Sequence, residues 1–223
     1  MSEVISSHSQ EEVRPELVTP THSQTPIVTK GKFFFAGEEK FFVKGVTYGP
    51  FKPGSHGAPL HGAPFPEREM ILRDFALMRE VGANTFRTFT VPPRWLLDMA
   101  GEAGLRVIVG IPWAEHVAFL DSPQLIRDIH RTIANGATAC RDHPAVLACL
   151  VGNEIPPDMA RWHGPDRVRN FLAKLVATVK SVDPQRLVSY ANFPSTEYLD
   201  FDDLDFVSFN VYLHREASFR SYL

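Results

Sequence analysis

The clearest candidate for chemistry in this 223-residue chain is a glutamate at the end of an apolar stretch. The residues from Val146 to Val151 are all apolar, Asn153 and Glu154 follow, and Pro156-Pro157 end the run because proline cannot donate to a sheet. A carboxyl group in such a place is poorly solvated, which raises its pKa and suits a general acid. Asn153 can orient that carboxyl or bond a ligand hydroxyl. The alternative is a glutamate that caps the next helix or pairs with an arginine.

Other polar side chains also stand at the ends of apolar runs. Arg87 shares a strand face with Thr85 and Phe89, so we expect it to point into the same hollow and hold a carboxylate there. A purely structural ion pair is the alternative for Arg87, and core packing is the alternative for Tyr212. The full set of such residues is Thr47, Tyr48, Arg87, Trp113, Asn153, Glu154, Asn192, Asn210 and Tyr212.

The elements that must position these residues alternate between short β-rich runs and amphipathic helices. The pattern predicts strands over residues 45–51, 84–90, 105–113, 145–155, 186–193 and 206–213. It predicts helices over about residues 67–81, 92–103, 123–137 and 168–182, and Ser122-Pro123 is a typical helix start. Alternating strands and helices indicate a parallel sheet with helices outside.

Two architectures fit such a parallel sheet, a doubly wound open sheet and a closed (β/α)8 TIM barrel. The chain has no glycine-rich phosphate loop, and its polar residues collect at many strand ends, so we favour the barrel. Six strands at about 28 residues per repeat fall short of the eight repeats and roughly 250 residues of a full barrel. We therefore expect a barrel truncated after about six βα units, preceded by a β-hairpin of Phe33–Phe35 and Phe41–Val43 that plugs or flanks it.

Composition sets the remaining expectations. Residues 1–30 are polar and predicted to be a disordered tail, and residues 31–223 are predicted to form the partial barrel. With 23 Lys and Arg against 26 Asp and Glu, the net charge of -3 argues against nucleic acid as a partner. We find no membrane segment and no signal peptide, and Cys140 and Cys149 read as buried thiols of a reducing compartment, so a cytoplasmic location is expected.

Four segments together carry a resemblance to a known group: KGVTYGPF, NTFRTFT, LVGNEIP and DFVSFNVY. In this order they resemble the clan A glycoside hydrolases, especially the family 2 and family 5 barrels, over about residues 31–214. The resemblance implies that Glu154 is the catalytic acid/base of a retaining glycosidase acting on β-glucan or a related polysaccharide. It also implies an oligo- or polysaccharide partner and no cofactor. The residues expected to bind substrate are Asn153, Arg87, Tyr48, Trp113, His116, Trp162, His163, Asn210 and Tyr212.

A closer likeness is to the hydrolase-like domain at the N-terminus of some bacterial family 2 glycosyltransferases. The segments TVPPRWLLD, GIPWAEHVAFLDS and VGNEIPPDMARWHG carry it. This likeness implies a fused or partner glycosyltransferase, and it makes a non-catalytic module that holds a glycan for that enzyme the alternative function. A phosphate-handling barrel lyase is less favoured, since its phosphate site lies after strands 7 and 8.

The departure from the hydrolase pattern concerns the second carboxylate. A retaining glycosidase needs two carboxylates about 5–5.5 Å apart, and in clan A the nucleophile is a glutamate on strand 7. That strand is not in this sequence, so we assign no nucleophile and expect weak or absent hydrolysis by residues 1–223. Glu115 is the best stand-in, although a loop carboxylate paired with His116 or an arginine is the simpler interpretation. No metal is expected, since His56 and His61 share a loop without acidic neighbours.

Overall fold

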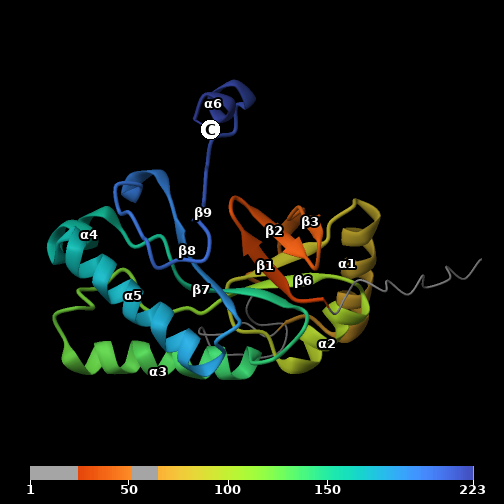
Figure 1. Ribbon diagram of the computed structural model, residues 1–223, viewed down its shortest axis with the longest axis horizontal. Helices are drawn as coiled ribbons and strands as arrows, with labels where there is room; N and C mark the ends of the chain where they lie inside the picture. The colour runs from red at the N-terminus through yellow and green to blue at the C-terminus, as the bar shows by residue number, and fades with distance from the viewer. Residues whose placement is uncertain (1–24, 52–64, 223) are drawn as a thin grey trace, which may run out of the picture.

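The computed structural model describes residues 25–51 and 65–222, which form two sheets with helices around the larger one (Figure 1). Most of the predicted tail, and the loop with His56 and His61, lie outside these residues. The smaller sheet is antiparallel and contains β1 (Ile27–Lys30), β2 (Phe33–Ala36) and β3 (Glu39–Phe41). The larger sheet contains β4 (Gly45–Thr47), β5 (Thr85–Thr88), β6 (Arg106–Gly110), β7 (Val146–Asn153), β8 (Leu187–Asn192) and β9 (Ser208–Phe209).

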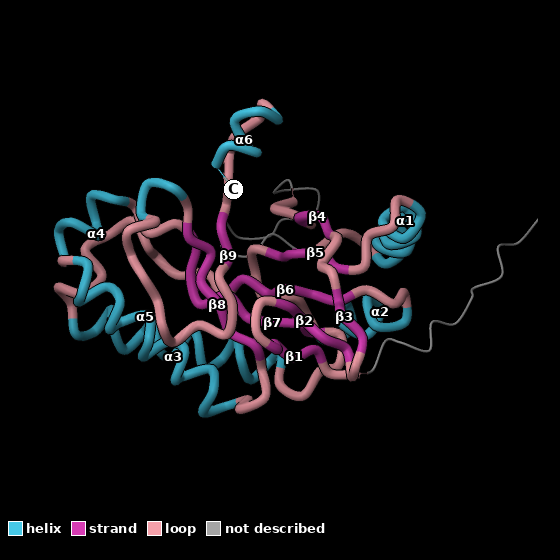
Figure 2. Tube along the Cα trace, turned by 45° about the horizontal axis from the view of Figure 1, so that its top comes forward, coloured by secondary structure: helices cyan, strands magenta, loops and turns pink. Residues whose placement is uncertain are grey.

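The larger sheet is parallel throughout, and its strands stand side by side in chain order. A doubly wound sheet reverses its strand order at a switch point, whereas a barrel adds each strand to the same side. Figure 2 shows the strands as a curved row with the helices at its periphery. The barrel-type fold class is therefore confirmed, while the truncation stays a prediction.

The helices follow the predicted pattern closely. They are α1 (Arg68–Glu80), α2 (Arg94–Glu102), α3 (Pro123–Cys140), α4 (Pro157–His163), α5 (Pro165–Val182) and α6 (Glu216–Tyr222), with a 3₁₀ turn at Pro194–Thr196. Ser122 caps α3, since its side chain accepts a hydrogen bond from the Leu125 N–H at 3.2 Å. The sequence pattern missed α4 and α6, each of which is only seven residues long. Within residues 25–51 and 65–222, none of the helices is both long and apolar enough to cross a membrane.

The small sheet covers the end of the larger sheet where its strands begin. Ile27 is buried against Leu147 and Leu187, close to the starts of β7 and β8, and Phe34 meets Phe206 at 5.1 Å between ring centroids. The predicted hairpin is thus a three-stranded plug at the end opposite the strand tips. It also corrects the predicted tail boundary, because residues 27–30 form β1 and Ile27 packs into the core.

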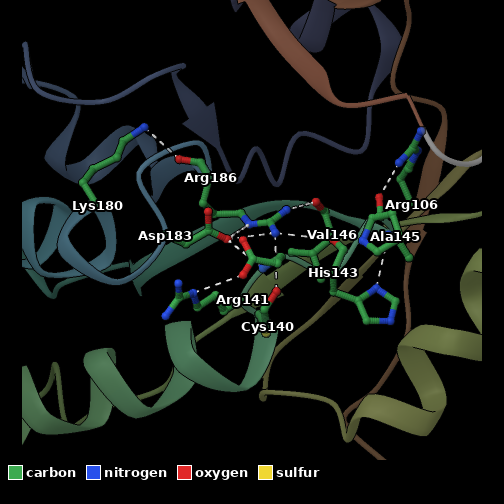
Figure 3. A network of polar contacts seen from close by, with 11 residues as sticks. Arg106, Cys140, Arg141, His143, Ala145, Val146, Lys180, Asp183 and Arg186 are labelled. Carbon is green, nitrogen blue, oxygen red and sulfur yellow. Dashed lines mark hydrogen bonds and ion pairs between the residues drawn. The ribbon is translucent and has the colours of Figure 1, made fainter.

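A partly buried arginine, Arg186, joins the turns at this same end (Figure 3). Arg186 donates to the carbonyl oxygen of Val146 and to Asp183 Oδ2 at 3.1 Å, so it joins the ends of α3 and α5 to the starts of β7 and β8. Lys180 adds a bond of 2.7 Å to the Arg186 carbonyl. Arg186 also donates to the carbonyl oxygens of Cys140, the last residue of α3, and of His143, each at 3.4 Å. These bonds satisfy carbonyl groups that the end of α3 and the following turn leave unpaired.

Two helical glycines provide a stability test of the close contact between α3 and the sheet. A Cβ at Gly136 would lie 2.8 Å from Ile111 Cγ2, whereas a Cβ at Gly101 of α2 would meet Ala145 at an ordinary 3.7 Å. Alanine favours both helices by about 1 kcal/mol, but the clash at Gly136 opposes it with about 1–3 kcal/mol. We expect urea denaturation to show Gly136→Ala destabilised and Gly101→Ala neutral or stabilised. Equal stability of the two variants would contradict this packing.

Candidate active site

Three polar side chains from alternate strands meet at the tips of the larger sheet. Arg87 lies on β5, Asn153 ends β7, and Asn210 follows β9. The guanidinium of Arg87 donates to Asn153 Oδ1 at 2.6 Å and to Asn210 Oδ1 at 2.8 Å, and the Asn210 amide donates to Asn153 Oδ1 at 3.0 Å. Side chains from alternate strands form one layer inside a barrel, so this trio is such a layer.

Glu154 sits directly on this layer. Its Oε1 accepts hydrogen bonds from the Asn210 amide at 2.8 Å and from the hydroxyl of the exposed Tyr212. Burial lowers the pKa of Arg87, and the charge of Glu154 opposes that effect, so the two groups lie within electrostatic reach. The bond to Glu154 raises the pKa of Tyr212, which keeps its phenol protonated as a donor. We expected Arg87 to hold a carboxylate by hydrogen bonds. It instead donates to the amide oxygens of Asn153 and Asn210 and acts on Glu154 through its charge.

Two backbone irregularities turn both Asn153 and Glu154 inward. Leu150 pairs with Ser189 and Asn153 pairs with Ala191, so β7 contains one more residue than β8 between these two pairs. Such a bulge re-aims the next side chain. Glu154 then has φ of 52°, a left-handed conformation that costs a residue other than glycine about 1–3 kcal/mol. Consecutive residues of a regular strand point to opposite faces, so this geometry is what brings both to Asn210.

Glu115 supports the strand end from the loop after β6. Its Oε1 accepts the backbone N–H of Asn153 at 3.1 Å, and the residue also lines a hollow of about 890 Å³ with Phe89, Trp113 and His116. Burial raises the pKa of the Glu115 carboxyl to about 7, although its backbone hydrogen bonds pull the other way. This contact differs from the expected pairing with His116 or an arginine, and it ties Glu115 to the candidate acid.

Two residues expected to bind substrate lie elsewhere. Tyr48 is buried among phenylalanines, and its hydroxyl donates to Asp74 on α1 at 2.7 Å. The imidazole of His163 has no exposed surface and stands 4.6 Å from the Phe119 ring, between centroids. Neither side chain presents a face to a ligand, so both predictions were wrong on placement. Strand-end position alone could not reveal that Tyr48 faces the helices.

The other aromatic residues predicted to contact substrate differ in their exposure. Trp113 donates its indole N–H to the Val151 carbonyl at 2.7 Å and meets Phe119 and Phe171 edge-on, so much of its ring supports β7. Trp162 is 68% exposed on α4, with its indole N–H bonded to Asp121 at 2.7 Å. His116 is exposed and lines the hollow beside Glu115. Sugar contact by Trp162 and His116 stays a prediction.

Known proteins share this arrangement of strands and helices to different extents. Residues 28–219 match the TIM-barrel domain of the glycosyl hydrolases family 2. The chain belongs to this family. A 1,3-beta-glucanosyltransferase of Aspergillus fumigatus is 39% identical over 140 residues, covering 60% of this chain and 30% of that protein. The beta-glucuronidase of Homo sapiens is 28% identical over 179 residues, covering 78% of this chain and 25% of the relative. This family 2 domain thus spans about a quarter to a third of these curated relatives.

Solved structures agree on the fold of the family 2 domain. A beta-glucuronidase of Bacteroides uniformis superposes with a TM-score of 0.66 at 22% identity, over 86% of this chain and 24% of that chain. A beta-glucuronidase of Ruminococcus gnavus gives a TM-score of 0.64 at 18% identity, over 83% of this chain and 31% of that chain. The predicted glycoside hydrolase resemblance is confirmed at the level of the family and of a glycosidase-type domain.

The position of Glu115 predicts a pH-dependent stability for the family 2 domain. The folded state holds this proton up to about pH 7, and the unfolded chain releases it near pH 4.5. The free energy of unfolding therefore falls as the pH rises from about 4.5 to about 7, by at most about 3 kcal/mol. Urea denaturation across this range should show a flatter curve for Glu115→Gln. Glu102→Gln, at an exposed position on α2, controls for the lost charge, and an equal slope in wild type and Glu115→Gln would refute the prediction.

Proposed function

We propose that this domain binds β-linked glycosides at the strand tips and cleaves them with Glu154 as general acid/base. The observation that carries the proposal is the pair of hydrogen bonds to one oxygen of Glu154. Asn210 and Tyr212 both donate to Oε1, while Oε2 has no hydrogen-bond partner among the described residues. A fixed carboxyl with one open oxygen suits proton transfer to a substrate atom.

The proposed first step is cleavage of the glycosidic bond between the anomeric carbon and the leaving oxygen. Glu154 gives its proton to that oxygen, and a nucleophile bonds to the anomeric carbon from the opposite face. In a retaining reaction water then displaces the nucleophile, and Glu154 takes a proton from that water. Arg87 contributes positive charge beside the carboxylate that remains. We assign no nucleophile, since Glu115 already bonds the Asn153 N–H.

β-Glucan or a related polysaccharide is the substrate class we propose. The hollow beside Glu115 combines the apolar surfaces of Phe89 and Trp113 with polar groups from His116, Thr132 and Asn135. Such surfaces suit the C–H faces and the hydroxyl groups of a pyranose. The names of the relatives, a 1,3-beta-glucanosyltransferase and a beta-glucuronidase, give further support to gluco-configured β-linked sugars.

A second candidate is a module that holds a glycan for a fused or partner glycosyltransferase. The specific observation in its favour is that, in the described part of the chain, Glu154 is the only carboxylate hydrogen-bonded to the side chains of Arg87, Asn153, Asn210 and Tyr212. A binding site needs no second carboxylate, whereas retaining hydrolysis does.

Separate measurements of binding and cleavage test the proposal. Binding of β-1,3-gluco-oligosaccharides would be followed by amide NMR shifts, and cleavage by release of phenol from aryl β-glucosides and aryl β-glucuronides. Each cleavage assay would also contain sodium azide, which can replace a missing nucleophile. We expect binding with weak cleavage that azide accelerates. Binding without any cleavage would favour the holding module, and the absence of both would overturn the proposed function.

A further inference from the structure

The backbone of the candidate acid is held on both sides by side chains from other elements. The N–H of Asn153 donates to Glu115 Oε1 at 3.1 Å, and the N–H of Ile155 donates to the Tyr190 hydroxyl at 2.7 Å. Between them, the N–H of Glu154 itself donates to the Ala191 carbonyl at 2.9 Å. Three successive donors at a bulged strand end are therefore all satisfied, although the regular ladder has stopped there.

The middle residue of these three has the left-handed conformation described above. A residue other than glycine stays in such a conformation only when its surroundings hold it there. We infer that Tyr190 and Glu115 are positioning residues for Glu154, because their oxygens accept the N–H groups of the residues on either side of it. The inference rests on the proposed function, since it assigns these residues to the catalytic step of that function.

Tyr190 is well placed for this role. It is fully buried on β8, its ring packs against Phe201 at 5.3 Å between centroids, and a Cβ at Gly152 would lie 3.3 Å from it. Glycine at 152 thus lets the bulge lie close to the tyrosine ring. Burial raises the pKa of the Tyr190 phenol, so the hydroxyl keeps its proton and accepts the Ile155 N–H with a lone pair.

Glu115 reaches the other side from the loop after β6. Its own N–H donates to the Trp113 carbonyl at 3.1 Å, which fixes the loop, and its carboxyl oxygen then meets Asn153. An amide oxygen can accept the same N–H, so Glu115→Gln should preserve the role and Glu115→Ala should abolish it. This pair separates the hydrogen bond from the charge.

Four variants test the inference in the cleavage assay. We expect Tyr190→Phe and Glu115→Ala each to lower kcat about tenfold, with KM within about twofold. Glu115→Gln should stay near wild type. Tyr48→Phe is the matched control. It also removes the hydroxyl of a buried tyrosine with one hydrogen bond, but that bond goes to Asp74 on α1, away from Glu154. Unchanged kcat in both Tyr190→Phe and Glu115→Ala would overturn the inference.

An NMR measurement decides the inference even if the wild type cleaves nothing. In Tyr190→Phe and Glu115→Ala, we expect the side-chain amide signals of Asn210 to shift, because its bond to Glu154 changes. The amide of Ile155 should also lose exchange protection in Tyr190→Phe, and Tyr48→Phe should change neither signal. If Tyr190→Phe does not fold, Glu115→Ala still supplies the Asn210 readout. Asn210 signals identical to wild type in the folded variants would overturn the positioning role whatever the activity.

Discussion

Glu154→Gln is expected to slow glycoside cleavage by about 10²–10⁴-fold, the usual contribution of a general acid or base. Glutamine has nearly the same shape and can still accept the hydrogen bonds of Asn210 and Tyr212 through its amide oxygen. It cannot donate and take back a proton as the carboxyl does. Binding of an oligosaccharide should therefore stay close to wild type while the release of product is lost. Rates of product release and NMR binding titrations on the same samples measure the two effects.

Asp158→Asn is the matched control for Glu154→Gln. Asp158 lies in the first turn of α4, is exposed, and undergoes the same change of charge and shape four positions further along the chain. We expect it to keep both binding and cleavage. Equal loss of cleavage in the two variants would mean that the charge of this end of the sheet matters, and that Glu154 has no special role.

Arg87→Met is the second change with a large expected effect. It removes two short hydrogen bonds to the oxygens of Asn153 and Asn210, together with the positive charge beside Glu154. Hydrogen bonds from a charged donor contribute about 1.5 kcal/mol or more each, so we expect a loss of about 3 kcal/mol in the free energy of unfolding. Urea denaturation measures that loss, and NMR titration measures the accompanying loss of oligosaccharide binding.

Two further arginine variants serve as an intermediate case and as a control for Arg87→Met. Arg87→Lys keeps the charge but not the two-pronged donor geometry, so it should fall between wild type and Arg87→Met. Arg220→Met removes an arginine whose pair with Glu216 is exposed on α6, and it should leave both stability and binding unchanged. An Arg87→Met protein as stable as Arg220→Met would show that the Arg87 layer does not hold the strand tips together.

The element pattern of this domain could be read from its sequence because local chemistry determined it. Leu125, Ile129, Ile133 and Ala137 recur every fourth residue in α3, and Ser122 begins that helix as expected. The apolar run of β7 is buried along its length, as a covered parallel strand requires. The meeting of Arg87, Asn153 and Asn210 was also predictable, because the tips of parallel strands lie at one edge of the sheet.

What could not be predicted depends on contacts between distant segments. No local signal shows that Tyr190 reaches the N–H of Ile155. For the bulge in β7 before Asn153, Gly152 is the one local hint, since a glycine inside a strand often marks a bulge. Tyr48 and His163 were misplaced for the same reason. Residue type and strand-end position do not tell which face of the sheet a side chain occupies when the strand is short or a helix follows.

The most direct test of the account compares two leaving groups in the presence of azide. A phenyl β-glucoside needs a proton on its departing oxygen, whereas a dinitrophenyl β-glucoside releases a weakly basic phenolate that does not. If Glu154 supplies the proton, Glu154→Gln should slow the phenyl glucoside by about 10²–10⁴-fold and hardly change the dinitrophenyl glucoside. Equal rates in wild type and variant for the phenyl glucoside, or equal slowing of both substrates, would contradict the role of Glu154 as the acid.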